Sequence, residues 1–151
     1  MKTIDLTIPR TSVESAVAEA TAYTGAKATD RDGQEAVFER VATADRDRNM
    51  IRRLVNEGFL EATERFRQFV TSSDFSGETL KVTMEVSDSY DTATTERARS
   101  TLESFLSAHA TARWLRFAFP AKAEEWEKEA AERLSELEAN LFHRPRPRRK
   151  H

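Results

Sequence analysis

The chain of 151 residues contains no cysteine, which excludes disulfides, thiol catalysis and metal sites built from cysteine. Glycine is also scarce: Gly25, Gly33, Gly58 and Gly77 lie too far apart to form a phosphate-cradling loop. No run of about 18 apolar residues is present, and the first residues, MKTIDLTIPRTS, lack the apolar core of a secretory signal. We therefore expect no contact with a membrane, and a location in the cytoplasm or in an assembly built there.

Motifs of the common catalytic sites are missing as well. The sequence has no His-Glu-x-x-His zinc motif, no paired Glu-x-x-His segments and no Gly-x-Ser-x-Gly elbow. His109 falls within a predicted helix, where a satisfied or exposed side chain is expected, and His143 and His151 flank the carboxyl-terminal tail. Glutamates such as Glu124 are followed four residues later by a cation, here Lys128, a spacing typical of a solvated helix face. We therefore expect a protein that is not an enzyme, with no catalytic residue, metal site, cofactor or small-molecule substrate.

The charge of the chain is balanced overall but unevenly placed. Hydrophobic residues make up 38% and charged residues 33%, with a formal net charge of −2, which argues against a disordered chain. The last eight residues carry five cations and no acid: Arg144, Arg146, Arg148, Arg149 and Lys150. Without these five, 19 cations face 26 acids, so residues 1–143 carry about −7 and the tail +5. The chain length fits a single helical domain, residues 1–143, followed by a basic Pro/Arg tail, residues 144–151.

Two short segments have the period of two that is typical of half-buried strands. In residues 3–8 the apolar positions are Ile4, Leu6 and Ile8, and Pro9 ends the pattern. In residues 79–86 the apolar positions are Leu80, Val82, Met84 and Val86. Because a lone strand is unstable in water, we expect the two segments to pair and to pack their apolar face on helices.

The segment after the first strand has helical spacing over about residues 12–24. Thr11 and Glu14 have the spacing of a capping box at its start, and Gly25 suits the position just beyond its end. We expect residues 26–34 to form a loop.

A short helical turn near residues 35–42 and then a long helix to about residue 71 are expected next, with Thr43 or Asp45 as the cap of the long helix. The predicted inward face of this helix is apolar: Ile51, Leu54, Val55, Ala62, Phe66, Phe69 and Val70. Gly58, in its middle, costs up to about 1 kcal/mol relative to alanine, unless close packing against another element offsets that cost.

The last third of the chain predicts a helical hairpin. One helix runs from Asp91 or Thr92 to about Phe119, and the next covers residues 121–142 with Pro120 in its first turn. The core stripe of the first helix is Ala98, Leu102, Phe105, Leu106 and Ala112, thickened by Trp114, Leu115 and Phe117. The seam of the second has coiled-coil-like steps of three or four residues: Ala123, Trp126, Ala130, Leu134, Leu137 and Leu141. The fold class predicted for the chain is mainly α, a bundle of three to four main helices with a small two-stranded β element.

Two features leave alternatives open. Trp114, Phe117, Phe119 and Trp126 either pack as the elbow of the hairpin or expose some of their rings at a subunit interface. The tail, whose two prolines prevent a helix and favour an extended arm, is either a solvated end or an arm that meets phosphate or an acidic protein face. It contains no aromatic residue, so stacking on bases is not expected.

The order of these elements resembles that of known phage proteins. A strand, TIDLTIP, leads to a helix ending in AYTGAK; a long helix and the strand LKVTMEV follow, then a helix with ARWLRF and a last helix ending in LFHRPRPRR. In these motifs the chain is similar to small helical proteins encoded in prophages of gut bacteria, and its size and layout are similar to head–tail connector (adaptor) proteins of tailed phages. The resemblance implies a virion structural role: a ring below the portal around the DNA channel, built in the host cytoplasm, with no catalytic residues.

Three functions are compatible with the sequence. The first is a virion assembly protein, a head–tail connector whose partners are copies of itself and other virion proteins. The second is a small nucleic-acid-binding or regulatory helical protein that uses the tail for non-specific DNA contact, and the third is an unrelated interaction domain. A dedicated nucleic-acid binder usually has a basic face across its domain, whereas here only the tail is basic. Charge therefore favours an assembly arm first and a DNA contact second.

Overall fold

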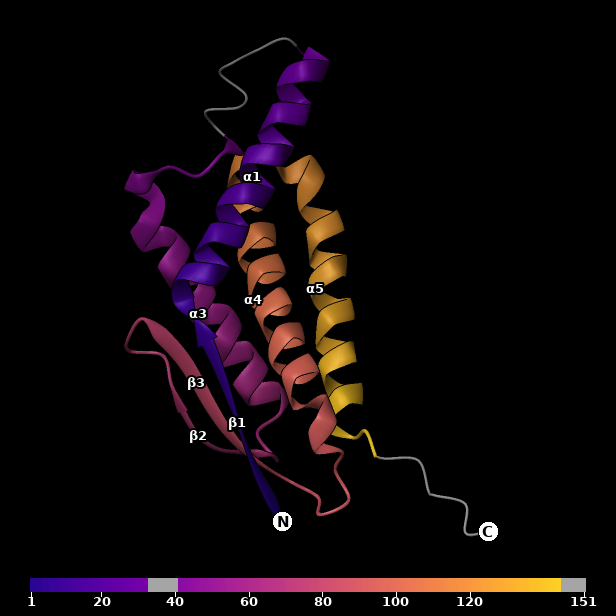
Figure 1. Cartoon of the computed structure of the whole chain (residues 1–151). Coiled ribbons are helices and arrows are strands. Elements are labelled where there is room, and N and C mark those ends of the chain that lie inside the picture. Colours follow the sequence, from indigo (N-terminus) through magenta and orange to yellow (C-terminus); the bar gives the residue numbers. More distant parts are fainter. Residues whose placement is uncertain (33–40, 145–151) are drawn as a thin grey trace.

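The computed structural model describes residues 1–32 and 41–144, and the other residues lie outside this description. Within these ranges the chain is mainly helical, with four α-helices and one small sheet (Figure 1). The helices are α1 (Arg10–Asp32), α3 (Arg48–Arg65), α4 (Thr95–Ala118) and α5 (Pro120–Leu141). None of the described helices combines the length and hydropathy needed to cross a bilayer.

The sheet joins the two segments that the sequence predicted to pair. Strand β1 (Lys2–Pro9) runs antiparallel to β3 (Thr79–Val86) in an unbroken register, with Lys2 opposite Val86 and Pro9 opposite Thr79. The alternating apolar residues of both strands are buried: Ile4, Leu6, Ile8, Leu80, Val82, Met84 and Val86. The predicted pairing of residues 3–8 with residues 79–86 is thus confirmed.

A third strand corrects the prediction of a two-stranded element. The long helix was expected to reach about residue 71, but α3 ends at Arg65, and β2 (Val70–Asp74) pairs with β3 in the sheet order β1-β3-β2. The chain leaves the helix through a turn in which the Phe69 N–H donates to the Phe66 carbonyl oxygen at 2.8 Å. The Phe69 carbonyl oxygen then accepts the Glu85 N–H at 2.7 Å, because the backbone is now extended beside β3.

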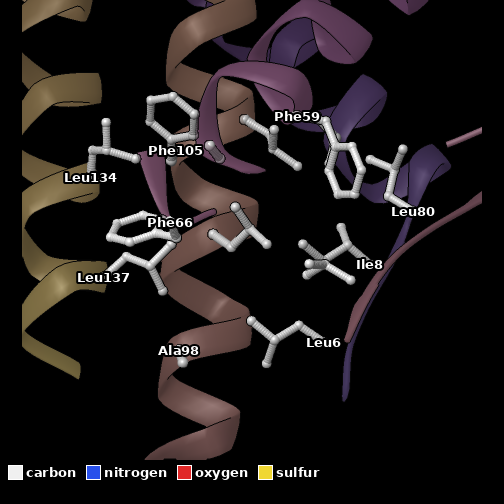
Figure 2. Close-up of a cluster of buried hydrophobic side chains, with 14 of the residues drawn as sticks. Leu6, Ile8, Phe59, Phe66, Leu80, Ala98, Phe105, Leu134 and Leu137 are labelled. Atoms are coloured by element: carbon white, nitrogen blue, oxygen red, sulfur yellow. The ribbon is translucent and has the colours of Figure 1, made fainter. Parts of the chain in front are cut away.

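Helix α4 lies at the centre of the fold. Figure 2 shows Leu134 and Leu137 of α5 on one side of α4. On the other side of α4 lie the side chains from the sheet, Leu6, Ile8 and Leu80. Half of the 24 residues of α4 are buried, and they include the predicted stripe of Ala98, Leu102, Phe105, Leu106 and Ala112. Every residue from Ala108 to Ala112 is buried, so this part of the helix is covered on all sides, whereas Ser100 and Ser104 are exposed. This extensive cover explains why the sequence of α4 is less amphipathic than that of a surface helix.

The predicted hairpin of α4 and α5 is present. Pro120 is in the first turn of α5, and the seam residues Ala123, Ala130, Leu134, Leu137 and Leu141 are buried. At the elbow, the Trp114 Nε1–H donates to the Val41 carbonyl oxygen at 2.7 Å, and the rings of Trp114, Phe119 and Trp126 pack against Val41, Leu115 and Ala123. The elbow is therefore a small core of its own, with the exception of Phe117, which is 71% exposed.

The first helix is longer than predicted. Instead of spanning residues 12–24, α1 begins at Arg10, so Thr11 lies within its first turn and not at the cap of a capping box. It continues to Asp32, with Gly25 buried inside it, so residues 26–32 are helix and not loop. A single glycine costs a helix only about 1 kcal/mol, which the alanine-rich sequence around it can offset. The rest of the expected loop and most of the helical turn predicted near residues 35–42 fall on residues 33–40, outside the described residues.

The two helices that follow each begin with a short 3₁₀ turn. Before α3 the turn is Asp45–Asp47, and the Asp47 carboxylate, instead of the predicted Thr43 or Asp45, accepts the Ala44 N–H at 2.8 Å. Before α4 the turn is Thr92–Thr94, and the Asp91 carboxylate accepts the Ala93 N–H at 3.0 Å. The helix was predicted to start at Asp91 or Thr92; the capped 3₁₀ turn lies there, and α4 itself begins at Thr95.

Candidate assembly surface

The loop of residues 87–91 connects β3 to α4 and receives the amino terminus of the chain. The Met1 ammonium lies 2.8 Å from the Asp88 carboxylate, and the Lys2 Nζ donates to the Tyr90 carbonyl oxygen at 3.1 Å. The hydrogen bond from the ammonium lowers the pKa of Asp88, which is fully exposed. Because β1 starts and α5 ends at this same end of the molecule, we call it the base (Figure 1).

The same loop holds the start of the basic tail. The segment Phe142–Arg144, the tail root, follows α5 directly, and its His143 Nε2 lies 3.4 Å from the Asp91 carboxylate. The Asp91 N–H donates to the His143 carbonyl oxygen at 3.1 Å, and the Arg144 guanidinium donates to the Ser89 hydroxyl. The tail therefore leaves the body from a defined point at the base.

The structure describes one of the five predicted interaction residues. Arg144 contacts the loop of residues 87–91, as given above, and is exposed. The other four, Arg146, Arg148, Arg149 and Lys150, lie outside the described residues. The structure shows where the basic tail begins, beside Ser89 and Asp91 at the base.

Part of the acidity of the body is found on α5. This helix carries seven glutamates and three cations. Five of these glutamates form ion pairs within 4 Å, with Lys122, Arg116, Arg133 and Arg65: they are Glu125, Glu127, Glu129, Glu136 and Glu138. Most of the acidic groups of α5 are thus already matched by a cation of the same chain.

The two edges of the sheet differ. Edge strand β2 has five residues and its register shifts between Val70 and Ser72, two features that hinder pairing with another strand. Edge strand β1 has eight residues and no irregularity. It is the longer and more regular of the two edges, and so the better template for an added strand.

Two hydrogen bonds show which backbone groups of β1 face outward. The Arg10 N–H donates to the Glu78 carbonyl oxygen at 2.8 Å, and the Glu85 N–H donates to the carbonyl oxygen of Phe69, the residue just before β2. Since backbone groups alternate sides along a strand, even-numbered residues of β1 bond to β3, and Thr3, Asp5 and Thr7 present their N–H and C=O groups at the open edge. In the described parts of the chain, nothing bonds to these groups.

The side chains of these same three residues form part of the exposed face of the sheet. Asp5 lies opposite Thr83 in β3, whose hydroxyl donates to the Asp5 carboxylate at 2.6 Å. Thr3 lies opposite Glu85. Lys81, opposite Thr7, adds a positive charge and is also paired in register with Asp74 of β2, so the exposed face beside the open edge is negative in sum. The alternation of residues 3–8 predicted the strand, but not that it would be an edge strand.

One buried histidine was not expected from the sequence. The His109 Nδ1 lies 3.3 Å from a Glu61 carboxylate oxygen, so α3 and α4 form a histidine–carboxylate pair that no local motif indicates. Only 6% of His109 is exposed, and its buried Nε2 has no hydrogen-bond partner in the described structure. Burial lowers the pKa of His109, because the cost of desolvating the imidazolium exceeds the attraction of Glu61. The expectation of a satisfied or exposed histidine is thus wrong for Nε2.

A pocket of about 370 Å³ adjoins this histidine between α3, α4 and α5. Its charged walls are Glu61, Arg65, Arg113, Arg116 and Glu127. Arg116 forms an ion pair with Glu127 within this lining, and Arg65 and Arg113 form ion pairs with Glu138 and Glu57, so each of the three arginines already has a carboxylate partner. In the described ranges, no three histidine or carboxylate side chains come together as they would in a metal site.

The chain was compared with protein families, curated proteins and solved structures. No family model, curated protein or solved structure matches the chain.

Proposed function

We propose that this chain is a non-enzymatic virion assembly protein of a tailed phage or prophage, a head–tail connector that associates with copies of itself around the DNA channel. Its basic tail acts as the assembly arm. Its partners are copies of the same chain and the neighbouring virion proteins. It acts in the host cytoplasm during assembly and then in the virion.

The observation that carries the proposal is the fixed start of an arm whose charge is opposite to that of the body. His143 and Arg144 are held by Asp91 and Ser89, and the following residues carry four more cations. Residues 1–143 carry about −7, so the arm is attracted to the body of another copy. Virion assembly, instead of association alone, is supported by the resemblance in order of elements and in the tail motif.

A DNA-binding function of the tail is the alternative. Five cations neutralise up to about five phosphates, with an affinity that falls steeply as salt rises. The acidic body disfavours this reading, because a nucleic-acid-binding domain usually extends its basic surface beyond one short segment. Within the proposal, contact of the tail with DNA in the channel is a secondary role.

The test compares the full chain with a chain that ends at His143, by sedimentation at about 0.1 M and 1 M salt, with and without double-stranded DNA. The proposal predicts that the full chain self-associates at low salt and that truncation abolishes this, because charge attraction is screened over about 10 Å at 0.1 M and about 3 Å at 1 M. Loss of DNA binding alone would favour the alternative. Genes for a portal, a capsid protein and a tail tube beside this gene would support the virion context.

A further inference from the structure

We propose that the open edge of β1 is the docking site for the tail of a second copy of the chain, which joins the sheet as a fourth, antiparallel strand. The inference rests on the proposed function, because it names the surface that the assembly arm meets. Three observations carry it: the open edge, the spacing of the prolines in the tail, and the position of the tail root.

The open edge offers a regular row of backbone groups. Thr3, Asp5 and Thr7 direct their N–H and C=O groups outward, over a strand with no bulge. Pro9, which lacks an N–H, belongs to the same outward-facing set, the position in which proline is tolerated in a strand. A strand added here gains main-chain hydrogen bonds in the manner of β-augmentation.

The tail has the composition of a strand that pairs on one side only. Residues 145–151 lie outside the described residues, and their sequence is PRPRRKH. Pro145 and Pro147 are two residues apart, so in an extended chain both missing N–H groups fall on one edge. Arg146 and Arg148 present their N–H groups on the other edge. Such a segment can add to a sheet and then stop further addition, because its outer edge is blocked by proline.

The direction of pairing follows from the side-chain faces. In an antiparallel pair, two residues that exchange hydrogen bonds point their side chains to the same face of the sheet. Arg146 or Arg148 then lies opposite Asp5 on the exposed face, where Glu85 adds a further negative charge. Parallel pairing would instead align the prolines with Asp5 and direct the arginines towards the helices. The charges therefore select the antiparallel arrangement.

The position of the tail root indicates that the tail docked on β1 comes from a second copy and not from the same chain. An antiparallel tail runs along β1 from Pro9 towards Lys2, so Arg144 must lie towards the Pro9 end. In its own chain Arg144 is held by Ser89, in the loop whose Tyr90 binds Lys2 at the opposite end of β1. A copy that gives its tail to one neighbour can receive the tail of another, and such head-to-tail contacts form a ring when the rotation between successive copies closes.

The acidic helix α5 is the weaker candidate for the same arm. Five of its seven glutamates already form ion pairs with cations of the same chain. A tail bound there would exchange one set of exposed ion pairs for another, and such pairs contribute little net stability.

Two matched proline variants of the full chain test the docking. Arg148→Pro removes an N–H from the edge that faces β1, whereas Arg149→Pro removes the same charge and adds the same ring, but on the outer edge. We expect Arg148→Pro to weaken self-association at about 0.1 M salt by roughly tenfold or more, and Arg149→Pro by less than about threefold, because only the first removes a ladder hydrogen bond and a cation on the face of Asp5. Sedimentation velocity over a range of concentrations measures both, and circular dichroism checks that the body is folded.

Equal effects of the two prolines would overturn strand docking. If truncation at His143 still abolished association in that case, the assembly arm of the proposed function would stand and only its docking site would be wrong. If truncation had no effect, or if the full chain stayed monomeric, both the docking and the arm would be refuted.

Discussion

Gly58 of α3 lies directly against the ring of His109 in α4: a Cβ atom at Gly58 would be 3.0 Å from the His109 Cδ2 and 3.2 Å from its Cγ. Both residues are buried, and His109 also contacts the ring of Phe105. The glycine in the middle of the helix is therefore the residue that lets α3 and α4 approach each other here. The sequence left open whether close packing accounts for Gly58, and this contact shows that it does.

Gly58→Ala is expected to destabilise the fold. The gain in helix propensity is at most about 1 kcal/mol, whereas forcing a methyl group into a packed core costs about 1–3 kcal/mol. Urea unfolding measures the change. The same substitution in a His109→Ala background should be neutral or stabilising, because the ring that the methyl group meets is gone. Equal destabilisation in both backgrounds would contradict the account.

The stability of the protein is expected to fall as the pH drops below about 6.5, the pKa of histidine in an unfolded chain. Burial lowers the pKa of His109 in the fold, so the unfolded state binds a proton first and folding stability rises with pH across this window. The loss should level off below the pKa of folded His109. Thermal melts between pH 8 and pH 5 measure it.

His109→Gln, which does not titrate, is the control for this pH effect and should flatten the profile in that window. Carboxylates whose pKa values are lowered, such as Glu127 by its hydrogen bond from Arg116, act at more acidic pH. An unchanged slope in His109→Gln would assign the effect to another group.

Arg10→Met is expected to destabilise the fold by more than about 2 kcal/mol, because three hydrogen bonds from a buried charged group are lost and such a bond contributes about 1.5–3 kcal/mol. Arg10 is fully buried and donates to the carbonyl oxygens of Gly77 and Phe75 at 3.0 and 2.6 Å and to the Asn56 side chain at 2.7 Å. It thereby ties the β2–β3 turn to α1 and α3. Chemical denaturation measures the loss.

Arg52→Met is the matched control for Arg10. Arg52 pairs with Glu78 at 3.0 Å near the same turn, but it is partly exposed, and an exposed pair contributes about 0–1 kcal/mol. Similar losses in the two variants would show that the burial of Arg10 is not what matters.

Leu134→Ala is expected to cost about 2–5 kcal/mol, as for other buried leucines. Leu134 is 7% exposed and belongs to the seam between α5 and α4. Ser135→Ala, on the exposed face of the same helix, should leave the midpoint of a thermal melt nearly unchanged. A melt unaffected by Leu134→Ala would show that the seam does not contribute to the fold.

The periodic parts of the chain could be predicted, because there the pattern and the packing agree. Residues 3–8 and 79–86 alternate cleanly, and the α4–α5 seam repeats every three or four residues; their apolar residues are buried as expected, except Trp126, which is half-buried. β2 was missed because its residues, VTSSD, are mostly polar and exposed, so no apolar alternation marks them. Phe69 and Val70 also continue the helical spacing of α3, although the chain has already turned.

The parts of the site that depend on distant residues could not be predicted from sequence. Glu61 and His109 come from different helices, and Arg10 reads as a surface cation until the β2–β3 turn closes over it. The tail was recognisable from its composition, but its start beside Ser89 and the open edge of β1 are properties of the fold. Local patterns specify elements, and tertiary contacts decide which faces and edges remain available.

The absence of native cysteine permits one direct measurement of contact between copies. A chain carrying only Thr3→Cys in β1 is mixed with a chain carrying only Lys150→Cys in the tail, and disulfide formation under mild oxidation is followed at about 0.1 M and 1 M salt. In the register that places Arg148 opposite Asp5, Thr3 lies directly opposite Lys150, and directly opposite residues that exchange hydrogen bonds have Cα atoms about 5.5 Å apart, within the range that a disulfide spans. The account predicts a mixed disulfide that forms rapidly at low salt, slowly at high salt, and slowly when Ser135→Cys on α5 replaces Thr3→Cys. Equal rates for the β1 and α5 positions, or no mixed disulfide, would contradict it.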